Sequence, residues 1–347
     1  MKASGHGMNP GPYRLPYVTG TANSGDADAM QRINDWLFVS EVEAPPATDP
    51  KNPAKPIWPP SGIRDGVTSL DYKVAANVPG WWSVAIFGEY MGAYPSAGEH
   101  TYNFDAHSGQ ILTVGVLFSP QGLATLTRNV QRARLKRLDD FVAKLPPEKP
   151  HAADAAPSTG DDEDAPTTQR MIYGDCRPLI ADGKLAEDEL KLTPDRLMVV
   201  REQCAAHAVQ AFDDLGEFSN GFAYAELAPL LSDYGRCLLV QRRTDCAIDA
   251  RGRGIGIGVY RGTLGGRYPV TFVIDTESGS VNYYFYDRVG KLIALEPKAL
   301  PQGGLRFTES PDNGPKAVFD LMPRPDGHLV GTWTQEGTGK TLAVDLH

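Results

Sequence analysis

The chain has 347 residues, of which 41% are hydrophobic and 22% charged, a composition that is ordinary for a globular protein. Its formal net charge of −9 at pH 7 argues against nucleic acid as a partner, because nucleic acid is bound by basic surfaces. The acidic balance fits a cationic partner, or it serves only solubility. No apolar run reaches the length of a membrane span, and residues 1–16 lack the apolar core of a signal peptide. We expect residues 1–13 to be a disordered N-terminus or a segment left by cloning or by trimming of the mature protein.

An α+β domain is predicted to begin at residue 14 and to run to residue 145. Ser24 or Asp26 is suited to cap a first helix, which places Met30, Ile33 and Leu37 on one side. Residues 44–61 are rich in proline and are typical of an extended surface connector.

An antiparallel meander is expected next. Residues 81–88 alternate with large apolar groups on both faces, so this strand should be covered on both sides. A Gly/Pro/Ser-rich loop is expected over 92–99, a strand over 100–105, a turn at 107–109, and a third apolar strand over 111–118.

From Pro120 the apolar period changes to that of a helix, which should stop at Pro146 and Pro147. Residues 146–169 are predicted to be a mobile acidic linker rich in proline and alanine. The α+β domain then resumes over 170–250, with strands around a turn at 193–195 and a strand feeding a short helix over 218–231.

Four cysteines lie in this second part: Cys176, Cys204, Cys237 and Cys246. None stands in a CxxC pair, which argues against a zinc cluster. An even number in one segment favours two disulfides, and we favour Cys176–Cys204 with Cys237–Cys246, because the second pair flanks a possible hairpin. Four buried free thiols in a cytosolic protein remain the alternative.

Residues 251–347 are predicted to be an all-β domain. Eight short strand-like segments each end at a turn signal, at a spacing of roughly ten residues that indicates an antiparallel barrel or sandwich. The glycine run at 252–258 is not a dinucleotide loop, because it lacks the following helix and the later acidic residue.

Several short motifs occur in the order seen in one family of exported bacterial domains. They are Gly92-Ala93-Tyr94-Pro95, Tyr102-Asn103-Phe104-Asp105, Ser108-Gly109-Gln110-Ile111-Leu112, Leu117-Phe118, Ile33-Asn34-Asp35-Trp36-Leu37 and Phe222-Ala223-Tyr224-Ala225-Glu226-Leu227. Residues 14–240 thus resemble the domain found as the outer part of a lysozyme-sensing anti-sigma factor and fused to peptidoglycan deacetylases. Tyr94 stands where that family has histidine. The resemblance implies an α+β domain outside the cytoplasm that deals with peptidoglycan or with the enzymes that cut it.

The C-terminal part resembles small β modules of exported proteins, through residues 283–286, 291–295, 305–309 and 329–333. It is also similar to bacterial inhibitors of invertebrate-type lysozyme, which present an SGxxY loop to the cleft of the enzyme. Here residues 278–283 read SGSVNY, with one residue more than that motif.

No catalytic pattern is found in the sequence. The seven histidines form no HxH or HExxH pattern, and no GxSxG elbow exists. His100 and His107 are expected to flank one turn, where two polar loop histidines are the simpler interpretation. We therefore assign no catalytic residue, metal or cofactor and predict that the protein is not an enzyme, although carboxylate pairs can form only in the fold.

Two loops carry the features of a protein-binding site, namely flexible glycines, hydroxyl groups and an aromatic anchor. The candidate partner-binding residues are Tyr94, Ser96, Glu99, His100, Ser278, Ser280 and Tyr283.

We therefore expect a periplasmic binding protein that inhibits a peptidoglycan hydrolase, either as a lysozyme inhibitor or as an immunity protein against a secreted effector. The alternative is an accessory protein of the cell envelope that binds peptidoglycan or carbohydrate, with Trp81, Trp82 or the tyrosines as stacking platforms. Such a protein would associate peripherally with the envelope. An unrecognised enzyme that acts on peptidoglycan is the third hypothesis.

Overall fold

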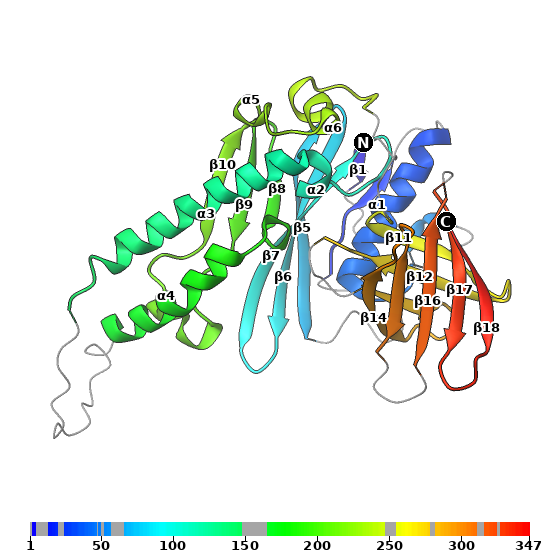
Figure 1. The fold of residues 1–347 in the computed structure, drawn as a ribbon. Helices are drawn as coiled ribbons and strands as arrows, with labels where there is room; N and C mark the ends of the chain where they lie inside the picture. The colour runs from blue at the N-terminus through cyan, green and yellow to red at the C-terminus, as the bar shows by residue number, and fades with distance from the viewer. Residues whose placement is uncertain are drawn as a thin grey trace.

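The structure is a computed structural model that describes residues 2–4, 13–19, 24–46, 48–49, 52–56, 66–147, 165–246, 255–277, 282–310, 316–324 and 327–347. It is an α+β fold with an antiparallel meander, followed by an all-β C-terminal domain, as the sequence predicts (Figure 1). Of the two predicted architectures for the C-terminal domain, the structure has the closed barrel.

The N-terminal part pairs β1 (Lys2–Ser4) with β2 (Tyr17–Thr19) and continues into α1 (Ser24–Val42). Ile33 and Leu37 are fully buried on the predicted apolar side of α1. The proline-rich connector contains a small pair of strands, β3 (Thr48–Asp49) and β4 (Asn52–Pro56).

The central sheet has three antiparallel strands in the order β5 (Val67–Val78), β6 (Trp81–Met91) and β7 (Pro95–Asp105). The predicted loop over 92–99 is wrong, because β7 already begins at Pro95 and only Gly92 to Tyr94 connect the two strands. The predicted turn after β7 is confirmed, with Gly109 at a φ of +73°.

The expected third apolar strand over 111–118 is also wrong. Ile111 makes one isolated bridge to Phe104, and the chain then forms the short helix α2 (Val114–Leu117). Thr113 caps this helix by accepting a hydrogen bond from the Val116 N–H.

Two long helices follow. Helix α3 (Pro120–Val142) is confirmed and starts at the cap Ser119, which accepts from the Gly122 N–H. Helix α4 (Ala165–Asp182) was not predicted and takes up the last residues of the expected linker. Residues 148–164, with the acidic run of that linker, lie outside the described residues.

A second three-stranded sheet has the order β10–β9–β8. Its strands and the short helical turns around them are η1 (Leu185–Glu187), β8 (Glu189–Leu192), β9 (Arg196–Arg201), η2 (His207–Phe212), β10 (Phe218–Ala223), α5 (Tyr224–Leu227), α6 (Asp233–Gly235) and η3 (Arg236–Val240). The hairpin around 193–195 and the strand feeding a short helix at 223 are both as predicted.

All eight predicted C-terminal segments form barrel strands, and β18 pairs with β11 to close the ring. The strands are β11 (Gly258–Leu264), β12 (Tyr268–Ile274), β13 (Asn282–Tyr286), β14 (Leu292–Ala299), β15 (Leu305–Glu309), β16 (Ala317–Pro323), β17 (Leu329–Gln335) and β18 (Thr341–Leu346). Aromatic rings fill the interior, where Phe272 stands 5.0 Å from both Tyr284 and Phe319, centroid to centroid.

The central sheet is covered on both faces, as the alternation of residues 81–88 predicts. Trp82 packs with α1 and with the barrel residues Tyr283 and Phe285, whereas Trp81 packs on the other face with α2, α3 and the second sheet. The two indole rings are 0% and 2% exposed, so neither is a stacking platform for a sugar. The Asp35–Arg261 ion pair, 2.7 Å long, further joins α1 to the barrel.

The two disulfides are Cys176–Cys204 and Cys237–Cys246, as predicted. The reason given for the second pair is wrong, because residues 236–240 are helical rather than part of a hairpin. Two disulfides indicate an oxidising environment. Among the described helices, none combines the length and the apolar character that crossing a bilayer requires.

One buried charge was not predicted. Arg134 lies on the inner side of α3 with its side chain 3% exposed and forms a 2.6 Å ion pair with Asp188, which is 1% exposed. The Asp188 carboxylate also accepts from Arg201 at 2.8 Å. Arg134 of α3 and Arg201 of β9 therefore share one acid between the helix and the second sheet.

Candidate partner-binding surface

The β6–β7 hairpin carries four of the seven predicted binding residues. Its register runs without a shift from Trp81 opposite Asp105 to Met91 opposite Pro95. The half near Trp81 is buried, whereas most residues over 87–100 are exposed. In Figure 1 the closed end of this hairpin stands clear of the barrel. We call residues 87–101 the distal hairpin.

The predicted residues of this hairpin lie close together. Tyr94 sits in the connection between the strands and is 64% exposed, and Ser96 and His100 are exposed on β7. The Tyr94 ring lies 6.0 Å from the His207 ring of η2, centroid to centroid, so the tip of the hairpin has one aromatic neighbour from another element.

Glu99 is half-buried and belongs to a charge cluster between β7 and β8. The Lys191 ammonium lies 2.7 Å from Glu99 and 3.2 Å from Glu189. Burial alone would lower the pKa of Lys191, but the hydrogen bond to Glu99 and the charge of Glu189 outweigh burial and raise it. Glu99 therefore anchors the hairpin to the second sheet, in addition to any contact with a partner.

Two exposed apolar side chains of the distal hairpin were not predicted. Phe87 is 39% exposed and Met91 is 55% exposed. Because side chains alternate along a strand, both lie on the same face of β6, with the exposed Glu89 between them. The predicted strand ends at Gly88, whereas β6 continues to Met91. The alternation of side chains along the sequence extends to Met91 and would have placed Phe87 and Met91 on one face.

The outer edge of β7 pairs with no further strand among the described residues, although β8 lies beside it near Glu99 and Asn103, where the Asn103 side-chain amide donates to the Leu190 carbonyl at 2.7 Å. Leu112 N–H donates to the Asn103 carbonyl and Asp105 N–H donates to the Gln110 carbonyl, so odd-numbered residues of β7 direct their backbone groups away from β6. The backbone N–H and carbonyl groups of Ala97, Glu99 and Thr101, which are also odd-numbered, therefore point away from β6 as well. Within the described parts of the chain, none of these three has a backbone partner on that side.

The second predicted loop gives no comparable surface. Ser278 and Ser280 lie outside the described residues. Tyr283 is 9% exposed, packs in the core shared with α1, and donates to the Val39 carbonyl at 3.3 Å. We therefore leave Tyr283 out of the candidate surface.

The expectation that His100 and His107 flank one turn is wrong. His100 lies within β7 opposite Ile86, whereas His107 follows the end of the strand and donates its N–H to Asp105. Among the described residues, no group of three His, Cys, Asp or Glu side chains is arranged to hold a metal ion.

The chain matches no protein-family model and no curated protein sequence. The resemblance to the exported, lysozyme-sensing domains therefore stays a prediction.

Proposed function

We propose that this protein is an exported, periplasmic binding protein that inhibits a peptidoglycan hydrolase through its distal hairpin. The observation that carries the proposal is the gathering of three exposed side chains, Tyr94, Met91 and Phe87, on one hairpin. The motifs shared with wall-associated exported domains and the two disulfides agree with that role.

The chemistry of the distal hairpin is that of a protein-binding site. Exposed aromatic and methionine side chains are typical anchors of protein interfaces. Near the tip, the backbone N–H and carbonyl of Ala97 have no partner on the outer side of β7 among the described residues, so an extended segment of the partner can bond to them, as in β-strand addition. The net charge of −9 attracts a basic enzyme and speeds the encounter.

The first test is a binding panel. The oxidised full-length protein is immobilised and offered purified lysozymes of several types, together with any secreted wall hydrolase encoded beside its gene. The proposal predicts 1:1 capture of one enzyme and loss of its activity on a peptidoglycan suspension. Absence of both binding and inhibition across the panel would contradict it.

Two variants of the distal hairpin and one control variant test whether the hairpin makes the contact with the hydrolase. Tyr94→Ala removes the most exposed anchor, and Ala97→Pro removes the outward N–H of β7 near the tip without touching the bonds to β6. Tyr268→Ala, a tyrosine of the barrel that is 39% exposed, is the matched control. We expect the first two to weaken binding and the control to leave it unchanged.

The accessory glycan-binding role is tested by adding purified peptidoglycan to the same binding panel. Binding to purified peptidoglycan without inhibition of any enzyme would select it, and release of soluble muropeptides by the protein alone would select an enzyme. Trp81 and Trp82 do not support the glycan-binding role, because both rings are buried.

A further inference from the structure

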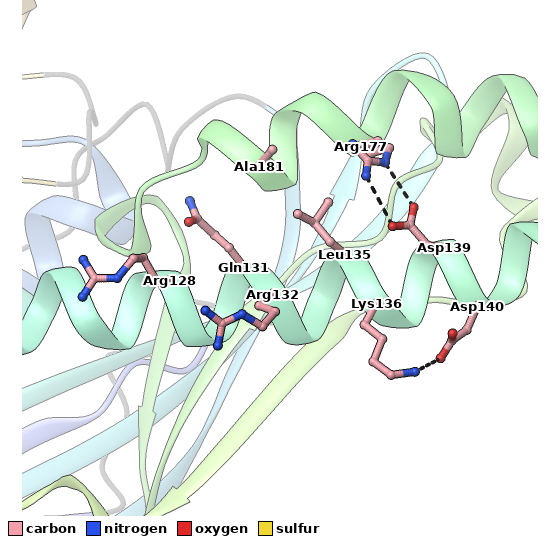
Figure 2. A pocket seen from close by; sticks show the side chains of 9 residues that line it. All are labelled: Arg128, Gln131, Arg132, Leu135, Lys136, Asp139, Asp140, Arg177 and Ala181. Carbon is pink, nitrogen blue, oxygen red and sulfur yellow. Dashed lines mark hydrogen bonds and ion pairs between the residues drawn. The ribbon is translucent and has the colours of Figure 1, made fainter.

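A groove lies between α3 and α4, away from the distal hairpin. It has a volume of about 510 Å³ and is lined by Arg128, Gln131, Arg132, Leu135, Lys136, Asp139, Asp140, Arg177 and Ala181 (Figure 2). Counted over the part of the chain that the structure describes, four basic and two acidic side chains give it an excess of two positive charges, in a protein that is acidic overall. The groove is therefore a cationic feature on an anionic molecule.

The acids of the groove neutralise only part of its charge. Asp139 pairs with Arg177 at 3.1 Å, and Asp140 pairs with Lys136 at 2.5 Å, as the dashed lines in Figure 2 show. All four of these side chains are at least half exposed, so each ion pair contributes little to the stability of the fold. An anionic ligand can therefore replace the aspartate as the partner of Arg177 or Lys136.

Arg128 and Arg132 are the other two basic side chains of the groove. Arg128 donates to the Thr125 hydroxyl at 3.0 Å, and neither guanidinium has an acidic partner among the described residues. The planar guanidinium group matches phosphate oxygens in a two-bond fork. Within the described residues, these two arginines are therefore the cationic groups of the groove that have no acidic partner.

The basic residues repeat along the helix. Arg128, Arg132 and Lys136 are four residues apart, and a rise of about 1.5 Å per residue separates them by about 6 Å each along α3. A linear chain with anionic groups at a similar interval can meet all three, whereas a single small anion meets one or two.

The lining also limits the ligand. Among the described residues that line the groove none is aromatic, so this lining lacks the stacking surface that nucleic acid bases and sugar rings use. Leu135 and Ala181 offer a small aliphatic floor and Gln131 an amide. We propose that the α3–α4 groove binds a linear, non-aromatic polymer of phosphate esters or phosphoanhydrides along the row Arg128, Arg132 and Lys136.

Binding is measured on the oxidised full-length protein by calorimetry at 50 mM salt. The probes are a short inorganic polyphosphate, a polyol-phosphate polymer and inorganic monophosphate, with polyglutamate as a carboxylate polymer. We expect at least one of the two phosphate polymers to bind, and the comparison between them identifies the source of the phosphate chain. Monophosphate and polyglutamate should bind at least about tenfold more weakly.

The variant Arg128→Gln/Arg132→Gln should weaken polymer binding about tenfold and reduce the log–log slope of affinity against salt by about 1.4. Arg267→Gln/Arg288→Gln removes the same charge from exposed positions of the barrel and should change affinity less than about twofold. No binding of either phosphate polymer, equal binding of polyglutamate, or an equal loss in the barrel variant would each overturn the proposal.

Discussion

Arg134 is the charge whose loss we expect to destabilise the fold most. Its guanidinium donates to Asp188 at 2.6 Å and to Asn220 at 2.9 Å, and it links α3 to β10 and to the segment before β8. Burial lowers the pKa of Arg134, and the neighbouring Asp188 carboxylate opposes that shift.

The substitution Arg134→Met keeps most of the apolar stem but removes the charge. Asp188 then stays buried with Arg201 alone. Breaking a buried pair costs about 3–5 kcal/mol, and the remaining Arg201 contact places the expected loss near the lower end, at about 3 kcal/mol. Because domains have a free energy of unfolding of only about 5–15 kcal/mol, this is a large fraction of the total.

The assay is guanidinium unfolding of the oxidised protein, followed by circular dichroism and tryptophan fluorescence. Arg128→Met, an exposed arginine of the same helix, is the control and should change the free energy of unfolding by less than about 0.5 kcal/mol. Adding Asp188→Asn to Arg134→Met should recover none of the loss, because Asp188 is still paired with Arg201 at 2.8 Å in the single variant. A loss below about 1 kcal/mol for Arg134→Met would refute this reasoning.

Two further predictions concern the disulfides and pH. Replacing Cys176 and Cys204 by serine opens a loop with a separation of 28 residues and should cost about 3.5 kcal/mol, against about 2.5 kcal/mol for the 9-residue loop of the other pair. Denaturant unfolding of the two double variants checks the order, and the reverse order would contradict this loop-length argument. Burial raises the pKa of Asp35, although Arg261 lowers it, so the folded state holds this proton more tightly than the unfolded state does. The free energy of unfolding of the wild type relative to Asp35→Asn should therefore fall as the pH rises above about 4, and a rise would contradict the sign.

Much of the fold could be predicted from local patterns. The eight barrel strands each end at a turn signal, and the stripe of α3 has its cap at Ser119 and its end before Pro146, so short-range chemistry was sufficient there. Barrel and sandwich could not be separated, because closure depends on the pairing of β11 with β18 across more than seventy residues.

The wrong predictions have physical causes. The apolar run over 111–118 is too short for its hydrophobic period to distinguish a strand from a helix. The Thr113 side chain caps the first turn of α2 and thereby stabilises the helix. Helix α4 contains Pro178 and directly follows an acidic, proline-rich stretch, both of which argue against a helix in sequence.

The candidate surface was predictable only in part. Tyr94, Ser96, Glu99 and His100 were chosen from a loop composition, and the structure places them together on a strand hairpin. The contact of β7 with β8 and the burial of Tyr283 could not be predicted, because both depend on which strands and which domain pack alongside.

The most direct test of the central claim is an inhibition titration of the captured hydrolase on a peptidoglycan suspension. The proposal predicts that wild-type protein abolishes activity at a 1:1 ratio, that Tyr94→Ala raises the inhibition constant about thirtyfold, and that Tyr268→Ala leaves it unchanged. Full hydrolase activity in the presence of excess wild-type protein, or equal inhibition by the Tyr94→Ala variant, would contradict inhibition through the distal hairpin.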